Sequence, residues 1–173
     1  MLTELANFRE HSDRYRAVTL LTLDAVPDDG SLDWRPAPGA FTLGQQLVHI
    51  AQAEEYYTYG LFEGEWRKEL VDLERAPRAK AGVREYFDGV RSRWTARLDA
   101  LTEGDLDTGH DSPDAPPGVT LRWWLWFILE HEIHHKAQSA LYLRLMGITP
   151  PFYAMPMPPG VRPDMASVPR EPV

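Results

Sequence analysis

Residues 120–146 read T-L-R-W-W-L-W-F-I-L-E-H-E-I-H-H-K-A-Q-S-A-L-Y-L-R-L-M, without a proline or a glycine. Apolar and histidine side chains recur along this stretch every three or four residues, the spacing that places side chains on one face of an α-helix. The pattern therefore predicts a long helix that stops near Gly147. The face expected to point into the protein carries Trp124, Phe127, Ile128, His131, His135, Gln138 and Tyr142.

Three other segments show the same periodicity, over residues 3–26, 42–62 and 81–101. The second begins with Thr42 and Gln45, a T-x-x-Q capping box in which each side chain satisfies a free backbone N–H. The connecting segments, including the acidic stretch 102–118, are rich in proline, glycine and aspartate, and no segment shows a convincing strand pattern. The sequence predicts an all-α protein, a four-helix bundle with long loops over residues 1–148.

The remaining residues, 149–173, contain eight of the fifteen prolines and cannot form a helix. We expect a proline-rich C-terminal arm. It either packs on the bundle through its aromatic and methionine side chains or extends away from it.

The composition excludes several kinds of partner and site. A net charge of −8 argues against nucleic acid or an anionic membrane surface as a partner, and no apolar run reaches the roughly 20 residues of a membrane span. We therefore predict a cytoplasmic protein that acts on a small molecule. Because the chain has no cysteine, a transition-metal site must use histidine and carboxylate ligands.

Three of the six histidines are candidate metal ligands. His131 and His135 lie one helical turn apart on an apolar face, where two buried imidazoles without an ion would each need a separate hydrogen-bond partner. His49 lies in the apolar run L-V-H-I-A, and taken alone it is better explained as a hydrogen-bonded core residue. Because bundle metal sites use side chains from facing helices, we predict His49 as the third ligand, which leaves an open coordination position. His134 flanks this face, where a surface position is favoured over contact with a metal ligand, and we expect His11 and His110 to be solvated.

The run from His131 to His135 also matches H-E-x-x-H, the zinc-binding helix of metalloproteases. The longer form of that motif needs another histidine downstream, and none follows His135. We therefore interpret the match as a coincidence. Glu132 is predicted to lie on the helix surface or to contact a ligand.

Two stretches resemble conserved blocks of the DinB/YfiT-like superfamily. They are L-D-W-R-P-A-P-G-A-F-T-L-G-Q-Q-L-V-H-I-A-Q-A-E, residues 32–54, and I-L-E-H-E-I-H-H-K-A-Q-S-A-L-Y-L-R-L-M-G-I, residues 128–148. The resemblance implies a four-helix bundle that binds zinc or nickel through His49, His131 and His135, and it makes a homodimer plausible. The second block departs from the usual H-R-G-Q, since Lys136 and Ala137 stand where arginine and glycine are common.

The resemblance also implies a chemistry. Characterised members include transferases and isomerases that use a low-molecular-weight thiol such as bacillithiol or mycothiol, so we predict a metal-dependent thiol transferase. One alternative is a metal-dependent hydrolase in which Glu132 or Glu54 serves as general base. The other is a non-catalytic metal-binding protein of a stress response. The sequence identifies no catalytic residue beyond the three ligands.

Overall fold

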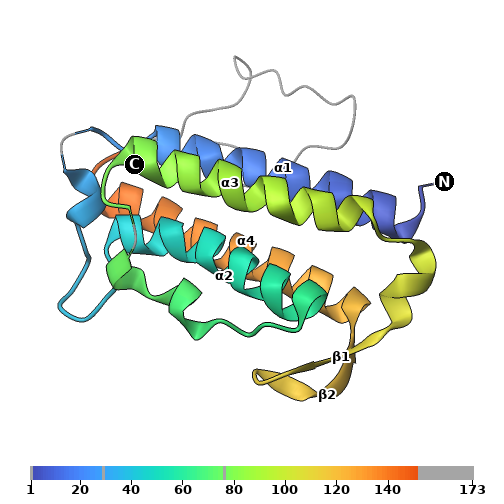
Figure 1. Cartoon of the computed structure of the whole chain (residues 1–173). Helices are drawn as coiled ribbons and strands as arrows, with labels where there is room; N and C mark the ends of the chain where they lie inside the picture. Colours follow the sequence, from blue (N-terminus) through green and yellow to red (C-terminus); the bar gives the residue numbers. More distant parts are fainter. Residues whose placement is uncertain (1, 29, 76, 152–173) are drawn as a thin grey trace.

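Four α-helices form the body of the protein in the computed structural model, which describes residues 2–28, 30–75 and 77–151 (Figure 1). The predicted all-α four-helix bundle is confirmed, and each helix begins and ends within a few residues of its predicted limits. The expected proline-rich arm falls mainly on residues 152–173, which lie outside the described residues. The helices are α1 (Glu4–Asp24), α2 (Leu43–Glu63), α3 (Lys80–Asp99) and α4 (Leu121–Leu145).

Side chains and glycines at the helix ends explain these limits. The predicted capping box of α2 is confirmed: Gln45 N donates to Thr42 Oγ1 at 3.1 Å, and Thr42 N donates to Gln45 Oε1 at 2.9 Å. These bonds satisfy two backbone donors that have no partner within the helix. Beyond α4, Gly147 adopts a φ of 76°, a left-handed conformation that ends the helix, as predicted.

Contacts between α2 and α4 show that these helices run in opposite directions. Gln46, near the start of α2, hydrogen-bonds Gln138 in the second half of α4. Tyr57, near the end of α2, packs against Trp124 in the first turn of α4 with ring centroids 5.3 Å apart. The middle of each helix therefore faces the middle of the other.

The connection from α2 to α3 runs back along α2. It contains two 3-10 helices, η2 (Lys68–Val71) and η3 (Leu73–Arg75). Trp66 packs against Gly60 so closely that a Cβ at Gly60 would overlap the ring, and Gln52 Nε2 donates to Asp72 O at 2.9 Å. Because the chain returns to the end where α2 began, α3 runs in the same direction as α2 (Figure 1).

The stretch 102–118, predicted as an irregular loop without strands, is partly ordered as secondary structure, so that prediction was wrong. It forms the 3-10 helix η4 (Glu103–Asp107) and the strand β1 (Gly109–Ser112), which pairs in an antiparallel hairpin with β2 (Ala115–Thr120). These strands are short, mostly exposed and interrupted by proline and glycine. They therefore carry no alternating apolar pattern that a sequence could reveal.

The core consists of two apolar clusters, one towards each end of the bundle. Buried ion pairs between Arg16, Glu54, Arg91 and Glu132 lie between them, at the middle of the four helices. The first cluster includes Leu23, Leu43, Leu47, Phe87 and Leu143, and the second includes Phe8, Trp94, Leu98, Trp124 and Leu125.

None of the helices that the structure describes has the length and hydrophobicity needed for a membrane span.

Candidate metal centre

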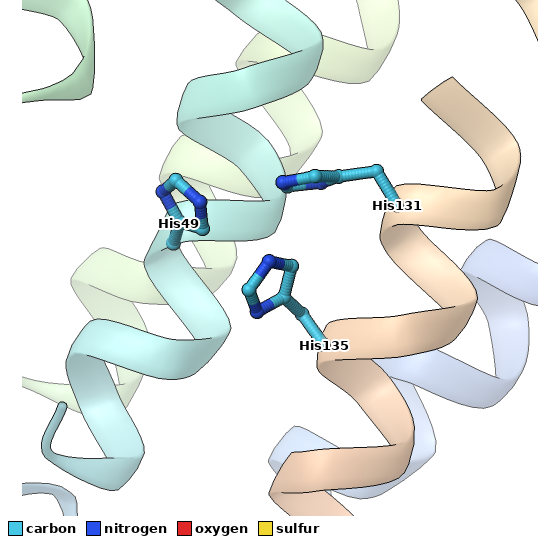
Figure 2. A group of neighbouring side chains, drawn as sticks. All are labelled: His49, His131 and His135. Carbon is cyan, nitrogen blue, oxygen red and sulfur yellow. The ribbon is translucent and has the colours of Figure 1, made fainter. Parts of the chain in front are cut away.

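The structure brings His49, His131 and His135 together between α2 and α4 (Figure 2). One nitrogen from each imidazole lies within 4.8 Å of the others. The ring of His49 is 5.0 Å from that of His131 and 4.7 Å from that of His135, measured between centroids. Nitrogens that share one zinc ion at about 2 Å lie roughly 3–4 Å apart, so modest rotations of these rings would bring all three onto one ion.

The local sequence explains how the two helices supply these side chains. His131 and His135 are one turn apart on α4, with ring centroids 4.3 Å apart. His49 lies in the first half of α2, opposite them, because the two helices are antiparallel. Phe41 packs edge-to-face against His49, with ring centroids 5.7 Å apart. The three rings are only half-buried, so they lie at the edge of the bundle rather than at its centre.

A side-chain amide orients one of the three imidazoles. The terminal amide of Gln46 lies 2.7 Å from His135 Nδ1, which leaves Nε2 of that ring available to an ion. Gln46 also hydrogen-bonds Gln138, and Gln138 Nε2 lies 2.7 Å from Nε2 of His134. Outer partners of this kind hold the ring and the tautomer of a metal ligand.

The donor set fits a divalent transition metal. His49 Nδ1 is buried and has no hydrogen-bond partner among the described residues. Leaving a buried polar atom unpaired costs about 1–3 kcal/mol, and an ion bound by that imidazole would offset such a cost. Three imidazoles without thiolates suit zinc or nickel better than calcium or magnesium, which prefer oxygen ligands.

The protonation state of the three rings also favours an ion. Burial lowers the pKa of His49, and burial together with the neighbouring imidazoles lowers the pKa of His131 to about 3 and that of His135 to about 4. All three rings are therefore neutral near pH 7. Neutral imidazole is the form that binds metal, because its unprotonated nitrogen carries a free lone pair.

The other histidines are not part of this group. His134 is exposed on the flank of α4, as predicted, with its ring centroid 4.9 Å from that of His135 and its Nε2 2.7 Å from Gln138 Nε2. His11 Nδ1 lies 3.0 Å from the carbonyl oxygen of Asn7 on its own helix. His110 belongs to strand β1.

Glu132 occupies a different place from the one expected. It is 4% exposed, so the prediction of a helix-surface residue was wrong. Its Oε1 accepts hydrogen bonds from Arg16 Nε at 2.9 Å and from Thr19 Oγ1 at 2.7 Å, both on α1. Although burial opposes it, the Arg16 guanidinium lowers the pKa of Glu132 below its usual range. The glutamate is held in the bundle interior by its ion pair with arginine. This position argues against the metalloprotease interpretation of H-E-x-x-H, in which the glutamate acts as general base beside the metal.

Glu54 belongs to the same buried group of charges. Its Oε2 accepts a hydrogen bond from Arg16 at 2.9 Å and lies 3.2 Å from Arg91 of α3. The two glutamates and two arginines thus join all four helices. Neither glutamate offers a carboxylate to the three histidines. This network could not be predicted from the sequence, because nothing in the local pattern marks these charged residues as buried until the facing helices are known.

A pocket of about 370 Å³ begins at the histidine group, where His49 and His131 line it. At its rim, Tyr56 Oη donates a hydrogen bond of 2.9 Å to Asp114 Oδ2, at the tip of the hairpin. Burial, and then the bond to Asp114, raise the pKa of Tyr56, and burial raises that of Tyr57 to about 12, so both phenols stay protonated at neutral pH. Sequence reasoning missed Lys68 and Asp114, which come from connecting segments without periodicity. The lining residues are His49, Ala53, Tyr56, Tyr57, Lys68, Val71, Asp114 and His131.

Comparison with solved structures identifies similar bundles in bacterial proteins. A DinB-like protein from Bacillus cereus ATCC 10987 is 25% identical with a TM-score of 0.69, over 83% of this chain and 93% of its own. The DinB-like protein YjoA from Bacillus subtilis is 26% identical with a TM-score of 0.68, over 87% of this chain and 99% of its own.

A third structure shares the fold at lower identity. YfiT from Bacillus subtilis, described as a probable metal-dependent hydrolase with an unusual four-helix bundle topology, is 20% identical with a TM-score of 0.63. The match covers 86% of this chain and 92% of YfiT. No curated protein matches the chain. The model of the DinB superfamily matches residues 11–139, which include all three histidines of the centre, and the chain therefore belongs to the DinB superfamily.

Proposed function

We propose that this protein is a metal-dependent enzyme in which a low-molecular-weight thiol attacks an electrophilic small molecule. The observation that carries the proposal is the position of the pocket, which His49 and His131 themselves line. An ion held by three histidines has at least one open position, and a ligand in the pocket can reach it.

A bound divalent ion would supply acidity, because it stabilises a thiolate or hydroxide at neutral pH. The contribution of the chain is to hold three neutral imidazoles in place and to shield the reacting sulfur. Tyr57 and Ala53 provide apolar wall beside the centre, where reduced contact with water favours the attack of sulfur on carbon.

The transfer itself is a substitution at carbon. The sulfur forms a C–S bond, the bond from that carbon to its leaving group breaks, and the leaving group departs with the bonding electrons. The thiol proton passes to solvent. No general base is needed, and this agrees with the engagement of Glu54 and Glu132 in ion pairs with arginine.

Hydrolysis is the second candidate, and one observation favours it. Asp114 is a carboxylate that lines the same pocket, and it could accept a proton from water near the centre. The description of YfiT as a probable metal-dependent hydrolase points the same way. Asp114 already accepts a hydrogen bond from Tyr56, however, so one of its two carboxylate oxygens is engaged.

Parallel assays separate these functions. Zinc-loaded and nickel-loaded protein is incubated with bacillithiol, mycothiol or glutathione and 1-chloro-2,4-dinitrobenzene, and also with ester, amide and lactam substrates. We expect formation of the thioether and release of chloride, and loss of both in His135→Ala. Hydrolysis of an ester, amide or lactam without thiol transfer would establish the second candidate. Inactivity in every assay would favour a non-catalytic metal-binding protein.

A further inference from the structure

Within the part of the chain that the structure describes, Lys68 is the one cationic side chain that lines the pocket next to the three histidines. It lies at the start of η2, on the segment that runs back along α2, and it is exposed. Among the described residues it forms no ion pair, whereas the preceding Arg67 is paired with Glu65. Its ammonium group is therefore available to a ligand in the pocket.

Packing against α2 and α4 holds the segment around Lys68 in place. Trp66, two residues before Lys68, contacts Gly60, and its ring lies 5.3 Å from that of Tyr56 and 6.2 Å from that of Trp124. Val71, at the end of η2, lines the same pocket. Both sides of Lys68 are thus anchored, which holds its backbone beside the pocket.

The charges around the pocket do not balance once a divalent ion is present. Imidazole coordinates a metal in its neutral form, so three histidine ligands would leave the charge of the ion uncompensated. Glu54 and Glu132 are already neutralised by Arg16 and Arg91. Among the described residues, Asp114 is the only carboxylate that lines the pocket, and it offsets no more than the charge of Lys68.

We propose that the thiol bound by this protein carries a second anionic group, a carboxylate, which Lys68 binds while the sulfur occupies the metal. This inference rests on the proposed function. A thiolate alone would leave part of the positive charge uncompensated, and a carboxylate at the other end of the ligand offsets the remainder. A charge-assisted hydrogen bond from Lys68 adds to the attraction. Lys68 is a residue that determines specificity rather than a catalytic one.

The test measures binding of defined thiols to the cobalt(II)-loaded protein. The probes are 3-mercaptopropionate and 6-mercaptohexanoate, each compared with its methyl ester, which removes the negative charge and keeps the rest of the molecule. The readout is the sulfur-to-cobalt charge-transfer absorption. Variants are Lys68→Gln and Lys68→Arg, with Arg144→Gln as the control, because Arg144 is an exposed cation at the end of α4, outside the pocket lining.

We expect at least one free acid to bind about tenfold more tightly than its ester. Lys68→Gln should reduce this preference to about twofold or less, Lys68→Arg should largely restore it, and Arg144→Gln should leave it unchanged. Equal binding of acids and esters, or a preference that survives in Lys68→Gln, would overturn the inference but not the proposed function. Absence of the charge-transfer band with every thiol would overturn both.

Discussion

Arg16 of α1 and Glu132 of α4 form a buried ion pair with two hydrogen bonds, Nε to Oε1 at 2.9 Å and Nη2 to Oε2 at 3.1 Å. Glu132 follows His131 directly, and successive residues of a helix point about 100° apart. One residue therefore faces the metal centre and the next faces the bundle interior. The ion pair sets the rotation of α4 and, with it, the direction in which His131 and His135 point.

Removing one partner of this pair should destabilise the protein strongly. Glu132→Ala leaves the two buried arginines, Arg16 and Arg91, with one buried carboxylate partner, Glu54, instead of two. Breaking a buried ion pair in this way typically costs about 3–5 kcal/mol. Urea unfolding measures the change, and Glu130→Ala, at an exposed position on the same helix, is the control. Adding Arg16→Met to Glu132→Ala should recover part of the loss. A cost below about 1 kcal/mol for Glu132→Ala would show that the ion pair contributes little.

Each of the three clustered histidines should be needed for tight metal binding. Replacing His49, His131 or His135 with alanine removes one of three ligands, so we expect the bound zinc or nickel per chain to fall sharply in elemental analysis. His134→Ala, a change in an exposed neighbour of the same residue type, should retain the metal. Full metal content in His49→Ala would disprove the three-ligand centre.

Gln46 should affect metal affinity without touching the metal. Its amide holds His135 through Nδ1, and loss of such a partner commonly lowers metal affinity by about 10–100-fold. Gln46→Ala should therefore raise the dissociation constant for zinc, measured by competition with a chromophoric chelator. Gln52→Ala is the matched control, because it removes a buried glutamine of α2 that bonds the carbonyl of Asp72 instead. Equal effects of the two changes would mean that Gln46 acts only through stability.

The metal-free protein should lose stability as the pH falls below the ordinary pKa of histidine. The pKa of His131 is lowered to about 3 and that of His135 to about 4 in the folded chain, against 6.5 for an unperturbed imidazole. Between pH 4 and pH 6.5 the unfolded state therefore binds more protons, and the stabilisation present above pH 6.5 is progressively lost. From pH 7 to pH 5.5 we expect a loss of about 1–2 kcal/mol from these residues.

Urea unfolding of the metal-free protein at the two pH values measures this loss. His131→Asn with His135→Asn is the comparison, since that double variant has no imidazole to titrate at these positions. Its stability should change less between the two pH values than that of the wild type. An identical pH dependence would show that the two rings titrate normally in the folded chain.

Helices and their ends could be predicted because their signals are local. The period of three to four residues, the capping box at Thr42 and Gln45, and Gly147 after α4 all act within a few residues of one another. The hairpin of β1 and β2 was missed for the opposite reason. Backbone hydrogen bonds hold it together, and its exposed residues show no alternation of apolar and polar side chains.

The sequence by itself determined the four helices and the three histidines that meet between α2 and α4, because a polar ring in an apolar helical stripe is visible as a pattern. Only the tertiary structure decided that Glu132 points towards Arg16, and that Lys68 and Asp114 lie beside the centre. Their positions depend on which helices face each other and on how two connecting segments fold back. Such long-range contacts leave no periodic trace along the chain.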